Sequence, residues 1–392
     1  MSLLVPAVDA GRQVDVAYFD FRKAFDTVDN DVLLTKLAGA GFTSHTLTFF
    51  ASYLQNRRQY VDCGGCLSDQ YPTRSGVSQG SNLGPLQFIL MINDLPEVVQ
   101  ESTCLLFADD LKLAREVGGI EDQVGLQRDI DRIVEWSHNN KLHFNVAKCS
   151  VLSFSRSRGP QHYPYHVGGK PLTRVAEVRD LGVRFNSDLN FRGHIAEVCK
   201  RAYRNLGFIL RQSHSFTNSR ALRALYEALV RSHLEYSLVV WSPSEIKYGT
   251  MLERIQNKFI RFLYLKLYGV YPGYPLLYPT LYVLGMVGYS KLEVRREVSL
   301  AKYLFEILRG KKENSAVLEE LKLYVPDKYV ERRKQPPLLA LPHARTNLLR
   351  QAPITRALRN LNRVADHIDL FKCTLDEFTK VVSNVIENKS FI

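Results

Sequence analysis

The sequence contains little cysteine, because only six of its 392 residues are of this type. Their irregular spacing argues against a disulfide scaffold and is typical of a reducing compartment. The first residues lack the basic flank and the apolar core of a secretory signal peptide. No apolar run approaches the length of a membrane span. We therefore expect an intracellular protein of the nucleus, the cytoplasm or both, which is not secreted and has no membrane partner.

Two of the cysteines, Cys63 and Cys66, form a Cys-x-x-Cys pair, and zinc is the first interpretation of such a pair. A structural zinc site needs two further ligands, and no cysteine or histidine follows at a suitable spacing. We therefore interpret the pair as the turn of a β-hairpin over residues 58–71.

Negative charge is in deficit, since 52 lysines and arginines face 40 acidic residues and give a net charge of +12. Such an excess favours a polyanionic partner, of which nucleic acid is the commonest. Hydrophobic residues make up 45% of the chain and charged residues 23%, which is typical of a globular protein. The length allows two or three domains.

Periodicity, caps and breakers predict the order of the elements. Strands are expected at residues 14–20 and 148–155, hairpins at 58–71 and 103–116, and short strands within 165–188. Helices are expected at residues 31–40, 44–55, 85–93, 121–139, 190–212, 217–236, 249–266, 290–310 and 375–388. A Pro-, Tyr- and Gly-rich connector covers 268–289. The change to basic helices divides the chain into residues 1–188, 189–266 and 267–392, the last of unknown role.

Asp109 and Asp110 stand side by side at the turn of the 103–116 hairpin. Two adjacent carboxylates repel each other, and a hard divalent cation is the usual compensation. Asp20 comes at the end of the first strand, and carboxylates from different strands that converge on two cations are typical of phosphoryl transfer. Alone, a strand that ends in an aspartate is weak evidence, and a helix cap or a salt-bridge partner is the alternative for Asp20.

Between these acidic elements lies a glycine-rich loop, residues 76–84, which opens the helix at 85–93. Small residues let the backbone approach a ligand, and the amides of a helix start face anionic groups. In this loop Gln79 can hydrogen-bond a base or a sugar. A plain loop before a helix is the simpler alternative.

These three elements, in this order, resemble the reverse transcriptase of non-LTR (LINE-type) retrotransposons, in particular the jockey-like elements. The matching strings are YFDFRKAFDTVDNDVLLTKL at 18–37, SGVSQGSNLGPLQFILMINDLP at 75–96, FADDLKL at 107–113, KLHFNVAKCSVLSFSR at 141–156, DLGVRFNSDLNFRGHI at 180–195, LVRSHLEYSLVVWSP at 229–243 and LERIQNKFIRFL at 252–263. The resemblance covers about residues 14–265. It implies an α+β right-hand polymerase palm, in which helices pack on an antiparallel sheet, followed by a helical thumb.

The resemblance assigns catalytic and metal-binding roles to Asp20, Asp109 and Asp110, with two Mg²⁺ ions as cofactors and Mn²⁺ as an alternative. It implies that Gln79 and Gly80 line the template and nucleotide site. Its other two assignments are a general acid and a steric gate.

The general acid is Lys148, which matches a lysine that protonates the leaving pyrophosphate. A solvated lysine at a strand start explains Lys148 equally well. The steric gate is Phe25, whose ring would clash with a ribose 2′-hydroxyl and so favour deoxynucleotides. A core phenylalanine is the alternative for this position.

The expected partners are an RNA template, a DNA primer and deoxynucleoside triphosphates. Basic helices at residues 192–211 and 220–231 carry several cations with interleaved Tyr203, Phe208, Tyr226 and Tyr236, as expected of a surface that grips phosphates. The alternative is a solvated basic face whose aromatic residues pack inward. We expect Tyr236 and Trp241 to lie in the core.

A right-hand polymerase has fingers before its first palm motif, and only 19 residues precede Asp20. We therefore expect an N-terminally truncated domain whose fingers are largely missing. A catalytically inactive nucleic-acid-binding remnant is one alternative to an RNA-directed DNA polymerase. An RNA-dependent RNA polymerase is another, although Ala108 before the acidic pair and Phe25 at the gate argue against it.

Overall fold

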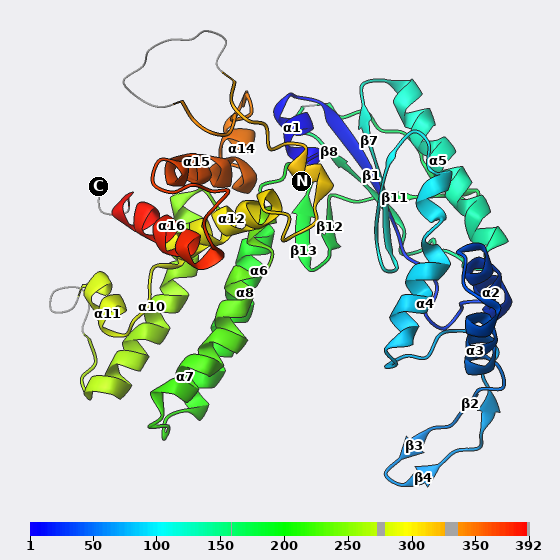
Figure 1. Cartoon of the computed structure of the whole chain (residues 1–392), viewed down its shortest axis with the longest axis horizontal. Coiled ribbons are helices and arrows are strands. Elements are labelled where there is room, and N and C mark those ends of the chain that lie inside the picture. Colours follow the sequence, from blue (N-terminus) through cyan, green and yellow to red (C-terminus); the bar gives the residue numbers. More distant parts are fainter. Residues whose placement is uncertain (158, 273–278, 326–335, 390–392) are drawn as a thin grey trace. The chain divides into compact units, whose positions relative to one another are not determined.

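A computed structural model of the chain describes residues 1–157, 159–272, 279–325 and 336–389 (Figure 1). The chain forms two compact units. Unit 1 comprises residues 1–10, 179–185 and 189–392, and unit 2 comprises residues 11–178 and 186–188. None of the helices in the described part of the chain is long and apolar enough to cross a membrane.

Unit 2 is built on a five-stranded sheet with the order β11-β8-β1-β7-β6. Its strands are β1 (Gln13–Phe19), β6 (Thr103–Phe107), β7 (Asp110–Val117), β8 (Ser150–Phe154) and β11 (Thr173–Arg174). Neighbouring strands are antiparallel, except that β11 runs parallel to β8. β1 lies at the centre, and six of its seven residues are buried, as expected for a strand covered on both faces. Unit 2 is therefore mixed α/β with a central sheet.

Helices cover the face of this sheet that carries Ala17, Phe19, Leu111 and Leu113. They are α2 (Asn30–Gly39), α3 (Ser44–Leu54), α4 (Leu83–Ile92), the 3₁₀ turn η1 (Leu95–Val98) and α5 (Ile120–Asn139). Asp29 caps α2, because its side chain accepts hydrogen bonds from the amides of Asp31 and Val32. The buried side chains of these helices and strands form one continuous hydrophobic core.

The remaining strands in the described part of the chain form short two-stranded ribbons. Residues 58–72 form a hairpin of β2 (Arg58–Gln59), β3 (Asp62–Cys63), β4 (Cys66–Leu67) and β5 (Tyr71–Pro72). Two further two-stranded ribbons are β9 (His166–Val167) with β10 (Lys170–Pro171), and β12 (Glu177–Asp180) with β13 (Val183–Asn186). The hairpin turns at Gly64-Gly65, where both glycines have positive φ, so the interpretation of Cys63 and Cys66 as a turn is confirmed.

Unit 1 is mainly helical. Its helices are α1 (Leu4–Asp9), α6 (Arg192–Gln212), α7 (Ser219–Tyr226), the π-helical turn η2 (Glu227–Arg231), α8 (Ser232–Glu235), α9 (Leu238–Trp241), α10 (Ile246–Tyr268), α11 (Thr280–Met286), α12 (Leu292–Leu308), α13 (Ser315–Leu318), α14 (Asn347–Arg350), α15 (Pro353–Ala365) and α16 (Leu375–Lys389). One hydrophobic core joins α12, α15 and α16, and the buried rings of Tyr226 and Phe259 stack 4.0 Å apart.

The expected strands and helices are confirmed as elements, with ends that shift by a few residues. The expected helix at 217–236 is interrupted by the π-helical turn. α15 was not predicted, because the prolines and polar residues before it favoured an extended stretch. Its apolar and polar residues nevertheless occupy separate faces, and a proline stands in its first turn. Part of the expected connector, residues 273–278, lies outside the described residues.

Candidate active site

Three acidic residues lie at one end of the unit 2 sheet. β1 ends at Phe19, which lies opposite Leu111 of β7, so Asp20 follows directly beside the start of β7. β7 begins at Asp110, which pairs with Phe107 across the two-residue turn from β6. The register therefore brings Asp20 to the same sheet end as Asp109 and Asp110.

The turn that carries Asp109 holds its backbone in an uncommon conformation. Ala108 has φ 48°, in the left-handed region that a residue with a Cβ rarely adopts. Strain of this kind persists where the surroundings fix the backbone, and it gathers at functional sites. In this turn Asp109 is half-buried, whereas Asp110 is exposed.

Asp20 has an unsatisfied carboxylate oxygen. Its Oδ2 is buried and accepts no hydrogen bond within the described residues. The Nζ of Lys148 lies 3.3 Å from Oδ2, which is an ion-pair distance without hydrogen-bond geometry. The Lys148 side chain is 67% exposed and that of Asp20 38%, so solvent screens this pair. The main chain fixes Asp20 more firmly, because its carbonyl accepts a hydrogen bond of 2.7 Å from the amide of Asn145.

A second carboxylate on the same strand gives the contrast. Asp15 is fully buried and accepts hydrogen bonds from Gln13 Nε2 at 2.8 Å, Ser153 Oγ at 2.5 Å and Tyr165 Oη at 2.8 Å. Its bonding capacity is used within the fold. Asp20 instead follows the end of the strand, and its Oδ2 accepts no hydrogen bond within the described residues. A buried oxygen of this kind is typical of a side chain that binds a ligand.

The donor set suits a hard divalent cation in kind. All three side chains offer carboxylate oxygens, which Mg²⁺ prefers, and Asp20 Oδ2 lacks a hydrogen-bond donor. Among the described residues, however, no three acidic, histidine or cysteine side chains are already grouped closely enough to hold a metal ion. By the chemistry of their side chains Asp20, Asp109 and Asp110 are candidate metal ligands, and that role stays a prediction.

The glycine-rich loop lies on the segment that follows Asp20. The amides of Gly76 and Val77 donate to the carbonyls of Val28 and Phe25, at 2.7 and 2.8 Å. Gly76 has φ +86°, and a Cβ there would come within 2.7 Å of the Asp26 carbonyl oxygen. Only glycine permits this approach.

One side-chain pair continues this attachment. The Nε2 of Gln79 donates a hydrogen bond of 2.7 Å to Oδ1 of Asp26. An ionised carboxylate only accepts, so this contact turns the amide nitrogen of Gln79 toward Asp26 and leaves its Oε1 for another donor. Gln79 and the neighbouring Gly80 are both exposed. Sequence reasoning missed Asp26, since no spacing rule links it to a loop about fifty residues later.

Two contacts support the same loop from α3 and the segment after it. The Arg57 guanidinium donates to the carbonyl of Gly76 at 3.0 Å. Hydrogen bonds with the hydroxyls of Ser81 and Ser78 lower the pKa of Tyr53. These contacts hold the loop between α3 and the start of α4.

Phe25 packs toward the core. Its half-buried ring stacks on the fully buried ring of Phe88 in α4, with centroids 4.5 Å apart and planes at 26°. A packing role of Phe25 is thus present, and the role as a gate beside a sugar stays a prediction.

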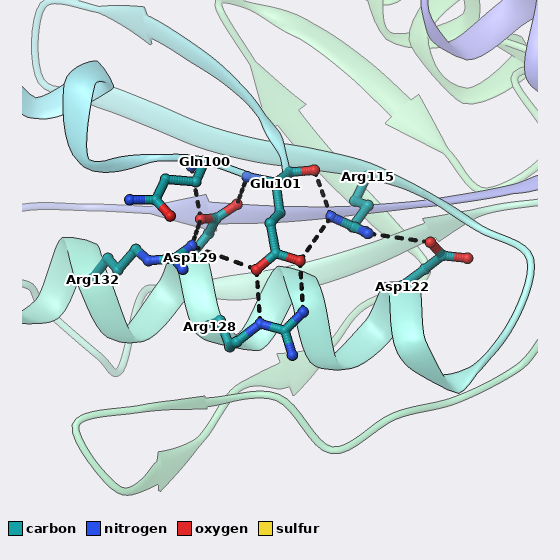
Figure 2. Close-up of polar contacts among 7 residues, drawn as sticks. All are labelled: Gln100, Glu101, Arg115, Asp122, Arg128, Asp129 and Arg132. Carbon is teal, nitrogen blue, oxygen red and sulfur yellow. Dashed lines mark hydrogen bonds and ion pairs between the residues drawn. The ribbon is translucent and has the colours of Figure 1, made fainter.

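An ion cluster clamps the open end of the β6–β7 hairpin to α5 (Figure 2). Glu101, just before β6, accepts hydrogen bonds of 2.7 and 2.6 Å from the two ends of the Arg128 guanidinium. This bidentate pair is the largest of the effects that lower the pKa of Glu101 to about 2. Arg115 of β7 donates to the Glu101 carbonyl at 2.5 Å and to Asp122 at 3.2 Å.

Asp129 binds the backbone of the same loop. It is fully buried, and its oxygens accept from the amides of Gln100 and Glu101, each at 2.9 Å (Figure 2). Burial alone would raise the pKa of Asp129, but the hydrogen bonds from the Gln100 amide, from Arg132 and from the Glu101 amide together lower it. Gly125 makes room for the cluster, since a Cβ there would lie 2.7 Å from the Arg115 guanidinium. The strands that present Asp109 are therefore anchored at their far end.

Unit 1 exposes basic and aromatic side chains on α6. Lys200, Arg201, Arg204 and Arg211 are exposed, and between them Tyr203 and Phe208 are 40% and 52% exposed. This α6 face agrees with the expected interleaved surface.

The other expected aromatic residues of unit 1 lie differently. Tyr226 is fully buried and therefore packs inward, and Trp241 is buried as expected. The core assignment of Tyr236 is wrong, because its ring is 55% exposed and its hydroxyl donates to the Leu181 carbonyl at 3.0 Å.

Comparison with known proteins identifies a family and several relatives. The family model described as reverse transcriptase (RNA-dependent DNA polymerase) matches residues 9–210. The RNA-directed DNA polymerase from mobile element jockey of Drosophila melanogaster is 26% identical over 258 residues, 62% of this chain and 28% of the relative. The probable RNA-directed DNA polymerase from transposon BS of the same species is 26% identical over 270 residues, 66% of this chain and 30% of the relative.

The chain thus spans about three tenths of the length of these curated relatives. Among solved structures, telomerase from Candida tropicalis in complex with a fragment of telomeric RNA aligns with a TM-score of 0.33 and 13% identity, over 70% of this chain and 46% of that one.

Proposed function

The chain belongs to the reverse transcriptase family, and from that premise we propose that it is an RNA-directed DNA polymerase of the non-LTR retrotransposon type. The reaction is the transfer of a deoxynucleotide to the 3′-hydroxyl of a DNA primer on an RNA template. The observation that carries the proposal is the meeting of Asp20 with the Asp109-Asp110 turn at one end of the sheet.

In this reaction Asp20, Asp109 and Asp110 hold two divalent cations, Mg²⁺ or alternatively Mn²⁺. When bound, the cations supply positive charge that activates the primer hydroxyl and neutralises the leaving pyrophosphate. Lys148, whose ammonium group already reaches Asp20 from a solvent-exposed position, donates a proton to that leaving group.

The nucleotide site lies over the glycine-rich loop. Gln79 presents its amide oxygen away from Asp26, and Gly80 leaves the adjacent backbone open to a ligand, since nothing lies within 4 Å of a Cβ built there. Phe25 is the steric gate that disfavours a 2′-hydroxyl. Its stack on Phe88 gives the ring a fixed position against which a sugar can be sensed.

We assign residues 1–188 as the palm, 189–266 as a thumb and 267–392 as a C-terminal region of unassigned role. The exposed cations of α6, with Tyr203 and Phe208 between them, suit the phosphates of the template–primer duplex. Contacts of this kind hold a duplex without reading its sequence.

Primer extension tests the proposal. The full chain, Asp109→Ala and the control Glu135→Ala, which removes an exposed carboxylate from α5, are given Mg²⁺, a DNA primer on an RNA template, and deoxynucleotides. The proposal predicts that the full chain and Glu135→Ala extend the primer in a template-dependent way and that Asp109→Ala does not. Extension by neither the full chain nor Asp109→Ala would reject it in favour of a non-catalytic binding protein, and equal extension by both would show that Asp109 is not catalytic. Equal use of ribonucleotides would favour an RNA polymerase.

A further inference from the structure

The hairpin of residues 57–74, called the arm below, stands apart from the core of unit 2 (Figure 1). All eight residues of its strands β2 to β5 are exposed. Its large apolar side chains are exposed too: Tyr60 by 53%, Val61 by 59%, Leu67 by 64% and Tyr71 by 44%. A lone two-stranded ribbon is only marginally stable in water, so this composition indicates a surface that binds a partner.

Cations gather at the stem of the arm. Arg58 and Arg74 are exposed, and neither forms an ion pair within the described residues. The two carboxylates of the arm lie farther toward its turn, and one of them, Asp62, accepts a hydrogen bond from the Gly65 amide at 3.0 Å. The stem therefore has unpaired positive charge.

One face of the stem combines these cations with an aromatic ring. Arg58 lies opposite Pro72 in the strand register, so both project to the same face. Tyr60 and Arg74 lie two residues beyond Arg58 and Pro72, just past the ends of β2 and β5, and continued strand alternation would bring them to the same face. Tyr71 lies opposite Gln59 and projects to the other face. The face of Arg58, Tyr60 and Arg74 is called the stem face below.

The stem is continuous with the glycine-rich loop. Arg74 lies two residues before that loop, and Arg57 donates to the carbonyl of Gly76. The main chain also closes the stem there, because the Thr73 amide donates to the Arg57 carbonyl at 2.8 Å. A nucleic-acid strand bound on the stem face would therefore lie next to the loop that is proposed to line the nucleotide site.

We propose that the stem face binds single-stranded nucleic acid, with Arg58 and Arg74 on phosphates and the Tyr60 ring stacked on a base. Guanidinium groups suit phosphate, and an aromatic ring accepts any base, so the interaction is independent of sequence. That the strand is the incoming RNA template rests on the proposed function. A protein partner for the arm is the competing occupant, and the test separates the two.

The test measures binding of the full chain to a short, labelled oligouridine by fluorescence anisotropy, without divalent cation, over a range of salt concentrations. Arg58→Gln/Arg74→Gln removes the two stem cations. Its matched control, Arg156→Gln/Lys170→Gln, removes two exposed cations of unit 2 outside the arm. Tyr60→Ala is matched by Tyr71→Ala, the same change on the opposite face.

The proposal predicts that the stem double variant binds more weakly and that the slope of log affinity against log salt falls by about 1.4, or roughly 0.7 for each phosphate that the protein no longer neutralises. Tyr60→Ala weakens binding at least about fivefold, and Tyr71→Ala does not. Arg58→Lys/Arg74→Lys retains the salt slope, which distinguishes removal of charge from a failure to fold.

Affinities of the stem variants equal to those of their controls would overturn the proposal. A change in self-association on Tyr71→Ala, with RNA binding unaltered in every variant, would overturn it in favour of a protein partner. Since binding is measured without catalysis, RNA binding that depends on the stem face in a chain that extends no primer would reject the proposed function alone.

Discussion

Single side chains decide what the candidate site can bind. Asp15 lies in β1 and Asp20 directly follows that strand, yet three hydrogen bonds satisfy the first, whereas Oδ2 of the second accepts no hydrogen bond within the described residues and has only the Lys148 ion pair. The pair of Asp26 and Gln79 is equally specific, because the carboxylate decides which end of the amide faces outward. Both features concern hydrogen-bond capacity, and both can be tested by exchanging single atoms.

Exchange of charge between Gln79 and Asp26 gives the first prediction. Gln79→Glu sets two carboxylates at the 2.7 Å contact, and their repulsion displaces the side chain from the nucleotide site. We expect the KM for deoxynucleotide to rise on the order of tenfold, which corresponds to about 1.4 kcal/mol. Adding Asp26→Asn restores a donor and with it the KM. Steady-state extension kinetics measure this, and failure of the double variant to recover would contradict the pairing.

Two buried glutamines give the second prediction. Gln87 of α4 is fully buried, and neither of its amide atoms has a partner among the described residues. Gln256 of α10 is fully buried too, but it donates to the Ser290 carbonyl at 2.9 Å and accepts from Tyr226 Oη at 3.4 Å. Gln87→Leu should therefore raise the free energy of unfolding by about 1–3 kcal/mol, and Gln256→Leu should lower it by a similar amount.

Urea denaturation of both variants measures the difference. A loss of stability in Gln87→Leu would show that its amide has a partner, such as an ordered water, and that the buried group is satisfied.

At the residue scale, sequence alone predicted the placement of Asp20 and Asp109, because both positions follow from strand ends and a turn. It could not predict the contact of Gln79 with Asp26, since that depends on a long intervening segment folding back. The exposure of Tyr236 was also missed. An aromatic residue in an apolar run usually lies in the core, and only the packed structure shows which side of the chain it faces.

At the scale of elements, the two ends of the β6–β7 hairpin differ. Its turn carries the acidic pair, and its open end is clamped to α5 by Glu101, Arg115 and Arg128 (Figure 2). The sequence predicted the hairpin and α5 because their periodicities differ clearly. It did not predict the clamp, since charged residues on a helix usually face solvent and no spacing rule connects them to a loop.

The acid response of this clamp gives the third prediction. The pKa of Glu101 is about 2 in the folded state, below its ordinary value near 4.5. A depressed carboxylate pKa contributes stability that is fully present above the ordinary value and is lost as the pH falls toward 2. Glu101→Gln should therefore have a lower urea midpoint than the parent chain at pH 7, and the difference should shrink between about pH 4.5 and 2.

The control for the clamp is Glu135→Gln, an exposed position on the same helix, which should leave the urea midpoint unchanged. A constant difference between Glu101→Gln and the parent chain at all pH values would contradict the account of its ion pairs.

At the scale of the whole molecule, the chain contains two units with separate cores. Each unit holds one of the two tryptophans, Trp136 in unit 2 and Trp241 in unit 1. The sequence predicted a change of texture near residue 189, and basic helices do follow there. Unit 1 also joins segments that are far apart in the sequence. Helix α1 is attached to α14 because the Asp9 carboxylate accepts hydrogen bonds from the amides of Arg345 and Thr346. No local pattern predicts that contact.

The fourth prediction concerns the pH dependence of the stability of unit 1. His194 of unit 1 is buried, accepts a hydrogen bond from the Arg184 amide at its Nδ1, and meets the Trp241 ring edge-on at 4.9 Å. Burial lowers its pKa to about 4, against nearby Glu197, which raises it, and Arg179 and Arg201, which lower it further. The unfolded chain then binds the proton more readily, so unit 1 loses stability as the pH falls from about 6.5 to 4, by up to about 1.4 kcal/mol per pH unit.

Urea denaturation followed by Trp241 fluorescence in a Trp136→Phe chain measures this loss. His194→Gln should flatten the dependence. If the free energy of unfolding of His194→Gln depends on pH as steeply as that of the parent chain, groups other than His194 cause the loss of stability.

The central claim is that Asp20 and Asp109 act as one catalytic site. The most direct test is single-turnover incorporation of one deoxynucleotide by the parent chain, Asp20→Asn, Asp109→Asn and the double variant, in Mg²⁺ on an RNA template. We predict that each single change lowers the rate on the order of a thousandfold or more, and that the double variant is no slower than either, because groups that act as a unit are not additive. A single variant that retains the parent rate, or losses that multiply in the double variant, would contradict the claim.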